Sequence, residues 1–163
     1  MSYAAGTNVG EERSRAEVQW LLEKFGVDQF GYANDRLANA AKIMFRYQGA
    51  SFVFTLPLAD AQDKRVRFTP GGRERVANQI SELIAVENRR RWRSLCLTIK
   101  AMLVGVEDGI LEFGQVFMPY MVWGDGRTTW QALLPTIQDA LGSGQALPTL
   151  EAAASGRLRL AKD

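Results

Sequence analysis

A single run of apolar residues at helical spacing restricts the fold of this chain more than any other feature. The run begins near Val76 and continues to Phe117, and Pro119 stops it. Its polar interruption lies between Glu87 and Arg91. The pattern predicts one long amphipathic helix whose apolar stripe faces the core.

The length of this helix is difficult to fit into one compact domain. About 45 residues at about 1.5 Å each give a rod of roughly 68 Å. A compact domain of 163 residues is about 40 Å across. We therefore expect the helix to bend, at the polar interruption or at Gly105 and Gly109, or to share its excess length with a second copy in a homo-oligomer.

Two stretches of alternating apolar and polar residues precede the helix and predict strands. They span residues 42–48 and 52–56, and Gly49 in the short connection can adopt a positive φ. This arrangement is typical of an antiparallel hairpin. A shorter stretch at residues 29–33 adds a third strand. One face of the sheet is expected to carry Ile43, Phe45, Tyr47, Phe52, Phe54 and Leu56.

Shorter helices flank these elements in sequence. Residues 11–25 have apolar side chains at helical spacing, and Gly26 follows where a left-handed cap would end the helix. Residues 128–141 predict another helix, with Pro135 inside it. The predicted fold is α+β: a small antiparallel sheet of about three strands packs on one long helix, bent or shared, with flanking shorter helices.

The length and a composition of 47% apolar and 23% charged residues fit one domain. We place this domain at residues 11–141, after a disordered N-terminus at 1–10 and before a loosely ordered tail at 142–163. Residues 59–72 are predicted to form a polar, basic loop between the sheet and the long helix. Residues 120–123 are predicted to form a short strand.

Several residue types that reactive sites require are absent or rare. The chain has no histidine, which excludes His-dependent triads and the common His-based zinc and iron sites. Its one cysteine, Cys96, cannot form an intramolecular disulfide, so a reducing, cytoplasmic compartment is expected. The sequence shows no phosphate-binding glycine motif, signal peptide or membrane span. We expect no cofactor and no membrane association, and no catalytic signature is visible.

Positive charge is concentrated in one segment of the chain. Between Lys64 and Lys100, ten Lys and Arg residues face three acids, Glu74, Glu82 and Glu87, which gives a formal charge of +7. The whole chain carries +2, so the remainder carries −5. Such an asymmetry is typical of proteins that bind a polyanion.

The densest part of this segment lies on the predicted long helix. Arg89, Arg93 and Lys100 fall on one side of it with Arg90 nearby, and these four cations are called the basic ridge. If the polyanion is nucleic acid, the basic ridge would contact phosphates, with the basic loop as a second contributor. The predicted nucleic-acid-binding residues are Arg65, Arg67, Arg73, Arg89, Arg90, Arg93 and Lys100.

Two other interpretations of the basic ridge stay open. Its cations could form a solvated face paired locally with Glu82 and Glu87, or they could bind an acidic protein partner. These two acids can neutralise only some of the four arginines that lie within five positions, which favours an external anion. Tyr32, Tyr47 and Trp123 are candidate platforms for stacking single-stranded bases, although each is more typical of a core residue.

Three acids near the end of the predicted helix give a weaker indication of a metal site. Asp108 and Glu112 are four residues apart and share a helix face, whereas Glu107, adjacent to Asp108, lies about 100° away. A two-metal site needs further converging carboxylates, such as Asp125. A solvated helix face is therefore the favoured interpretation.

Short motifs occur in a defined order along most of the chain, from about residue 52 to residue 134. In order they are Phe54-Thr55-Leu56-Pro57-Leu58, Arg91-Trp92-Arg93-Ser94-Leu95, Ile99-Lys100-Ala101, Glu112-Phe113 and Gly124-Asp125-Gly126-Arg127-Thr128. This order resembles small uncharacterised proteins of tailed phages and prophages. The resemblance implies a phage or mobile-element origin, and hence the host cytoplasm, but it brings no established activity.

The predicted order of helix, three strands and long helix also resembles two nucleic-acid-binding architectures. These are the double-stranded-RNA-binding domain and the core of single-strand annealing recombinases, and the resemblance concerns topology alone. The double-stranded-RNA module normally ends with a much shorter helix, so the annealing-type comparison suits the predicted length better.

These observations predict a non-enzymatic, phage-type nucleic-acid-binding protein. Single-stranded DNA is favoured over a specific duplex sequence, because no base-reading helix motif is visible. The alternative is a protein-interaction module that modulates a host or phage protein through the same basic ridge. A metal-dependent nuclease that uses Glu107, Asp108 and Glu112 is the third interpretation.

Overall fold

The computed structural model describes residues 10–143 of the chain. These belong to two compact parts, one that extends to Thr129 and one that starts at Trp130. Except for residues 10, 142 and 143, the predicted disordered N-terminus and loosely ordered tail lie outside the described residues. The elements in order are α1 (Glu11–Phe25), β1 (Gln29–Asp35), β2 (Ala40–Tyr47), β3 (Ala50–Pro57), α2 (Lys64–Arg67), α3 (Ala77–Glu107), α4 (Phe113–Phe117), the 3-10 helix η1 (Met118–Tyr120) and α5 (Thr129–Gly142).

The predicted α+β fold is confirmed. The three strands form one antiparallel sheet in the order β1-β2-β3. Gln48 and Gly49 connect β2 to β3 with φ angles of 49° and 80°, so both central residues of the tight turn are left-handed. This is the turn geometry whose twist matches that of paired strands, and the short loop sets the register of Tyr47 opposite Ala50.

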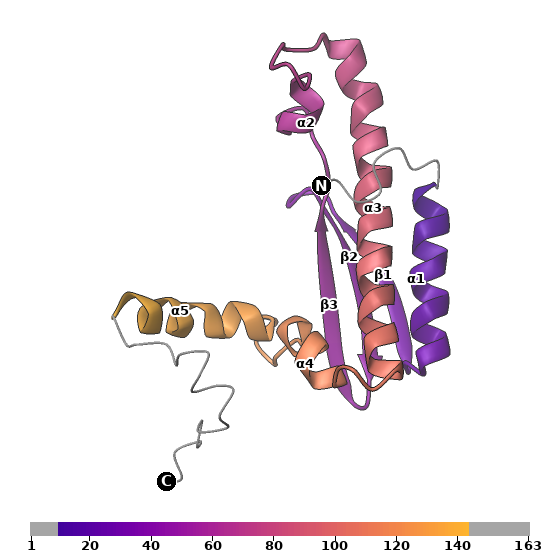
Figure 1. Cartoon of the computed structure of the whole chain (residues 1–163), viewed down its shortest axis with the longest axis vertical. Helices are drawn as coiled ribbons and strands as arrows, with labels where there is room; N and C mark the ends of the chain where they lie inside the picture. Colours follow the sequence, from indigo (N-terminus) through magenta and orange to yellow (C-terminus); the bar gives the residue numbers. More distant parts are fainter. Residues whose placement is uncertain (1–9, 144–163) are drawn as a thin grey trace. The chain divides into compact units, whose positions relative to one another are not determined.

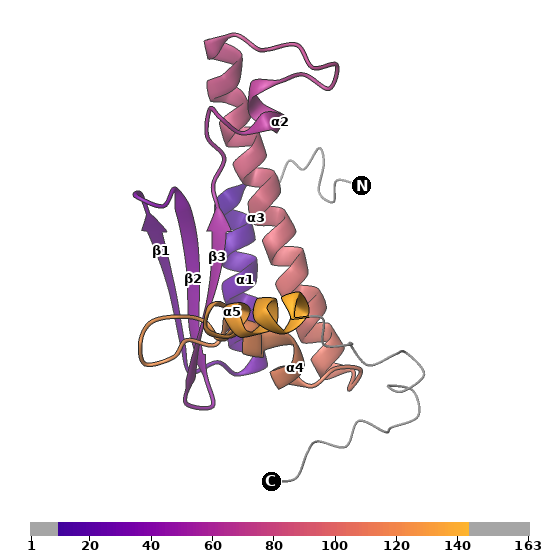
Figure 2. The ribbon, with the colours of Figure 1, turned by 90° about the vertical axis from the view of Figure 1, so that its left-hand side faces the viewer.

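One face of the sheet is covered by α1 and α3, and no helix within residues 10–128 covers the other, which is called the open face (Figure 2). Alternation along the strands places large apolar side chains on the covered face, where each buried one contributes about 1.5–3 kcal/mol. On the open face Lys42, Met44 and Arg46 are at least partly exposed. The buried core of this part comprises Val18, Leu22, Ala41, Ile43, Phe45, Phe52, Phe54, Trp92, Cys96, Ile99, Leu103 and Phe117.

The long helix α3 is shorter than the sequence predicts. It ends at Glu107, because Gly109 adopts a φ of 68° and the N–H groups of Ile110 and Leu111 both donate to the carbonyl of Gly105. The apolar run continues past this turn into the separate helix α4. At about 1.5 Å per residue, the 31 residues of α3 span about 46 Å. This length exceeds the expected diameter of about 40 Å by only about 6 Å, so it no longer requires a second copy to cover it.

Replacing Gly109 with alanine is expected to lower the free energy of unfolding by about 1 kcal/mol, because a Cβ disfavours the left-handed backbone required there. The space around Gly109 is open, so the loss would come from backbone strain and not from a clash. Urea unfolding of the variant tests this. Gly114, which has no positive φ and also lies in open space, supplies the control Gly114→Ala, which should not show this loss.

The N-terminal half of α3 extends beyond the sheet, and residues 58–76 lie alongside it (Figure 1). The sequence predicts a loop there, but residues 64–67 form the short helix α2, which packs against α3. Asp63 caps α2 by accepting from the N–H of Arg65 at 3.0 Å. The Arg75 guanidinium donates to the carbonyls of Arg65 and Val66 and so closes this segment on itself.

The short strand predicted at residues 120–123 is only partly formed. Tyr120 belongs to η1, and the next residues make isolated bridges, Met121 with Phe52 and Val122 with Thr128. The Val122 N–H donates to the carbonyl of Ser51 at 2.8 Å, which joins this segment to β3. The second part of the chain contains most of α5, which has Pro135 inside it as predicted.

Candidate nucleic-acid interface

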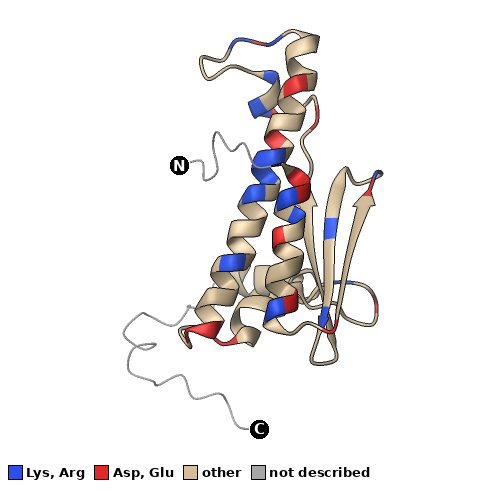
Figure 3. Ribbon diagram, turned by 90° about the vertical axis from the view of Figure 1, so that its right-hand side faces the viewer, with Lys and Arg blue, Asp and Glu red and all other residues tan. Residues whose placement is uncertain are grey.

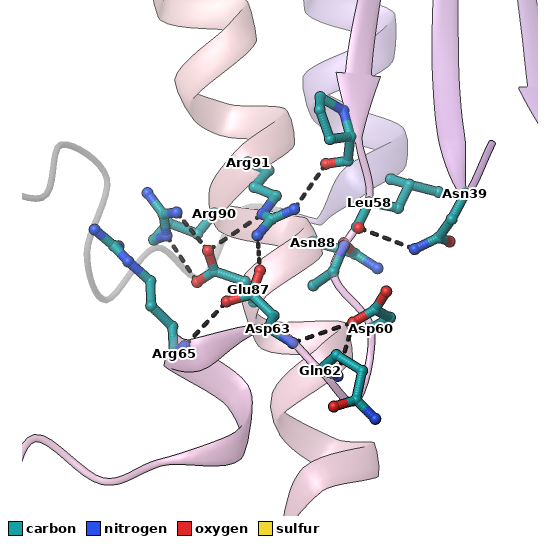
Figure 4. A network of polar contacts seen from close by, with 12 residues as sticks. Asn39, Leu58, Asp60, Gln62, Asp63, Arg65, Glu87, Asn88, Arg90 and Arg91 are labelled. Carbon is teal, nitrogen blue, oxygen red and sulfur yellow. Dashed lines mark hydrogen bonds and ion pairs between the residues drawn. The ribbon is translucent and has the colours of Figure 1, made fainter. Parts of the chain in front are cut away.

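A network of ion pairs joins α3 to the segment that leaves the sheet (Figure 4). Glu87 on α3 is buried and accepts from Arg90 and Arg91. Arg91 also pairs with Asp63 at the start of α2, and it donates to the carbonyl of Pro57 at 2.9 Å. Two arginines that follow one another on α3 are thus neutralised by acids of the same chain.

The pKa values of Glu87 and Arg90 are shifted in the directions that a tight ion-pair network produces. Hydrogen bonds from Arg90 and Arg91 hold the pKa of Glu87 below its ordinary value, against the opposing effect of burial. The hydrogen bond to Glu87 in turn raises the pKa of Arg90. The neighbouring Asn88 accepts from the N–H of Ala59 at 2.7 Å, so α3 anchors the chain where it leaves β3.

Two further cations of the basic ridge, Arg93 and Lys100, contact α1. Arg93 pairs with Glu17, and the Lys100 amine lies 3.9 Å from the same carboxylate. The Arg93 side chain is 22% exposed and that of Lys100 is 50% exposed. Lys100 therefore remains accessible to an external anion, whereas Arg93 is largely used in holding α1 against α3.

The structure contradicts the premise that the ridge cations stay largely unneutralised. Acids and bases lie next to one another along α1 and α3 (Figure 3). Glu87 was an expected partner, but Glu17 and Asp63 were not, because they lie 76 and 28 residues from Arg93 and Arg91. Of the ridge, Arg89 alone has no hydrogen bond or ion pair to its side chain among residues 10–143.

The predicted cations of the basic loop differ in their side-chain contacts. Arg67 pairs with Glu74 at 2.8 Å and donates to Gln62. The exposed Arg73 shows no side-chain partner within the described part of the chain. Arg65 lies on α2 near Glu87 and Arg90 (Figure 4). Lys64, which belongs to the predicted basic loop, is exposed at the start of α2 and has no side-chain partner among the described residues.

The candidate stacking aromatics are not gathered on one surface. Tyr47 packs against Phe25 and Phe113. Trp123 is 43% exposed, and its indole N–H donates to Thr129 at 2.9 Å. Tyr32 alone reaches the level of the basic ridge, where its ring centroid lies 5.6 Å from that of buried Trp92.

The structure places the two kinds of candidate reactive group in the sequence, the acids near the end of α3 and the thiol of Cys96. No group of three or more acids, Cys or His able to hold a metal occurs among residues 10–143. Because α3 ends at Glu107, Asp108 and Glu112 do not share a helix as predicted, and Glu112 instead caps α4. Burial raises the pKa of the Cys96 thiol to about 11, so this thiol is a poor nucleophile at neutral pH.

The comparisons with known proteins add no identity. The chain matches no protein-family model, no curated protein and no solved structure. Within residues 10–143, none of the helices combines the length and the apolar character needed to cross a bilayer. Any function proposed for this chain therefore depends on the charges and contacts of the site itself.

Proposed function

We propose that this protein binds single-stranded nucleic acid through its phosphates and carries out no chemistry on it. The observation that supports the proposal is the positive charge left on the basic segment after its internal ion pairs are formed. Lys64, Arg73 and Arg89 have no side-chain partner in the described part of the chain, and Lys100 is half-exposed. Lys100 is included because half of its side chain stays exposed beside Glu17. These four residues are called the residual cations.

Their arrangement suits a flexible strand better than a duplex. The residual cations lie on α2, on the turn before α3 and along α3, and the stretch of α3 from Ala77 to Lys100 alone spans about 35 Å. A single strand can follow such spaced positive charges, and its affinity comes from phosphate contacts that carry no sequence information.

The double variant Arg73→Glu/Arg89→Glu is expected to bind an oligonucleotide at least about tenfold more weakly at low salt, because two phosphate contacts are replaced by repulsion. Fluorescence anisotropy with a labelled strand of about 16 nucleotides, the upper end of typical site sizes, measures this. Neither arginine has a described side-chain partner, so the substitutions should leave the fold intact. Charge reversal of Arg90 or Arg93 is unsuitable, since it would place new carboxylates against Glu87 or Glu17.

A matched control reverses the same number of positive charges at a different surface. Lys24 near the end of α1 and Arg46 on the open face of the sheet are both exposed, and neither takes part in an ion pair among the described residues. Lys24→Glu/Arg46→Glu should weaken binding much less than Arg73→Glu/Arg89→Glu. Equal losses in the two double variants would show that only net charge matters and would reject the proposed surface.

A protein-interaction role is the second candidate, and an apolar surface that borders Lys100 favours it. The outward side of α3 carries a shallow apolar groove of about 490 Å³. Val104→Gln removes apolar area from this groove without changing the charge. Its oligonucleotide affinity should therefore equal that of the natural chain, which separates the two roles. Lining this groove are Ser94, Leu97, Thr98, Lys100, Ala101 and Val104.

A further inference from the structure

A second groove lies on the first part of the chain, where the N-terminal half of α1, the β1–β2 turn and the middle of α3 meet. Its volume is about 430 Å³, within the range of about 300–1,000 Å³ that is usual for small-molecule sites. Unlike the apolar groove on α3, it is lined mainly by polar groups. The lining includes the side chains of Arg15, Tyr32, Asn34, Arg36, Asn39 and Asn88.

A stacked cation forms one wall of this groove. The Arg15 guanidinium lies over the ring of Tyr32 at 4.9 Å and over that of Trp92 at 5.5 Å from the ring centroids. Arg15 has no ion pair or hydrogen bond to its side chain among residues 10–143. A guanidinium held against aromatic rings is a planar surface on which a further flat group can stack.

Three asparagines supply hydrogen-bonding groups that are only half used. Asn34 accepts from the Tyr32 hydroxyl, and Asn88 accepts from the N–H of Ala59, and the amide donors of both have no partner among residues 10–143. Asn39 donates to the carbonyl of Leu58 at 3.0 Å, and its side-chain oxygen accepts from no group in the described part of the chain. Asn39 and Asn88 lie on either side of Leu58 (Figure 4). The groove thus offers both donors and acceptors.

The charges of the groove favour a neutral group over a compact anion. Two cations, Arg15 and Arg36, are matched by two lining acids, Glu11 and Asp35. Asp35 accepts from the N–H of Ala38 and from Lys42, which lowers its pKa and keeps it ionised. A free phosphate would meet the Glu11 and Asp35 carboxylates as well as the cations, although Lys42 offsets the charge of Asp35. A flat, neutral group with donors and acceptors gains stacking and hydrogen bonds.

We propose that this groove binds one nucleobase of an unpaired strand. The base stacks on the Arg15 guanidinium, and its edge meets the amides of Asn34, Asn39 and Asn88. The sugar and phosphate stay outside the groove, near Arg89, which follows Asn88 on α3. The inference deepens the proposed function and rests on it for the source of the base.

Nuclear magnetic resonance of the full chain tests the groove separately from the phosphate surface. In one arm a nucleoside without phosphate, such as deoxyadenosine or deoxycytidine, is titrated to millimolar concentration, and inorganic phosphate is titrated in another. The nucleoside is expected to shift the side-chain amide signals of Asn34, Asn39 and Asn88, and phosphate is expected not to shift them. Absence of nucleoside shifts, or equal shifts with phosphate, would overturn the proposal.

Variants separate this inference from the proposed function. Arg15→Met keeps an unbranched side chain over Tyr32 but removes the planar cation, and it should weaken nucleoside binding at least about fivefold. If Arg15→Met does not fold, exposed Asn34→Ala is the substitute and should lose part of the same shifts. Arg73→Glu/Arg89→Glu should retain nucleoside binding while losing oligonucleotide affinity.

The two proposals can therefore fail independently. Nucleoside shifts without oligonucleotide binding would retain the groove and reject the proposed function. Oligonucleotide binding without nucleoside shifts would retain the proposed function and reject the groove.

Discussion

Phe117→Ala is expected to lower the free energy of unfolding by about 4 kcal/mol, the usual cost of removing a fully buried aromatic side chain. The Phe117 side chain is 0% exposed, and α4 and the sheet pack around it. Its ring centroid lies 4.4 Å from that of Phe113 on α4 and 6.0 Å from that of Phe45 on β2. Truncation leaves a cavity at the junction of helix and sheet, which urea unfolding monitored by circular dichroism measures.

The neighbouring Met118 provides the control. Its side chain is 50% exposed, so Met118→Ala should change the free energy of unfolding by no more than about 0.5 kcal/mol. Similar losses in both variants would contradict the packing of α4 against the sheet.

Glu87→Ala is expected to destabilise the fold by about 2 kcal/mol. Removing one partner of a buried ion pair usually costs about 3–5 kcal/mol. The loss here is smaller because Arg90 and Arg91 keep 21% and 20% of their side chains exposed to water. The surface pair of Arg67 and Glu74 is the control, since Glu74 is 58% exposed and Glu74→Ala should cost less than about 1 kcal/mol.

The same carboxylate makes the stability of the protein depend on pH. Because its arginine partners lower the pKa of Glu87 in the folded state, its contribution is fully present above the unfolded value of 4.5. The contribution disappears as pH falls through the lower folded pKa. The difference in unfolding free energy between the natural chain and Glu87→Gln should therefore be constant at neutral pH and shrink below about pH 4.5. A difference that does not change with pH would contradict the network.

The parts of the fold that depend on local signals could be predicted from the sequence. Period-two alternation and Gly49 gave the β2–β3 hairpin, and Gly26 marks the end of α1 with a φ of 97°. The end of α3 could not be predicted in the same way. The apolar run continues through residues 110–117 because α4 packs on the same core as α3, so periodicity does not reveal the turn at Gly109.

The candidate site shows a similar division. Helical spacing identified Glu87 as a neighbour of the ridge, because that contact is local. The contacts of Arg93 with Glu17 and of Arg91 with Asp63 depend on how α1 and α2 pack beside α3, which no sequence spacing encodes. The same holds for the groove, where Arg15, Asn34 and Asn88 come together from three separate elements.

Positive charge left over from internal ion pairing is proposed to bind a nucleic-acid strand, and the salt dependence of oligonucleotide affinity tests this most directly. The four residual cations predict that the logarithm of the binding constant falls with the logarithm of salt concentration at a slope of about −3 for a single strand. The slope should fall to about −1.5 in Arg73→Glu/Arg89→Glu. A slope that is the same in both proteins, or no binding at the lowest salt concentration, would contradict the claim.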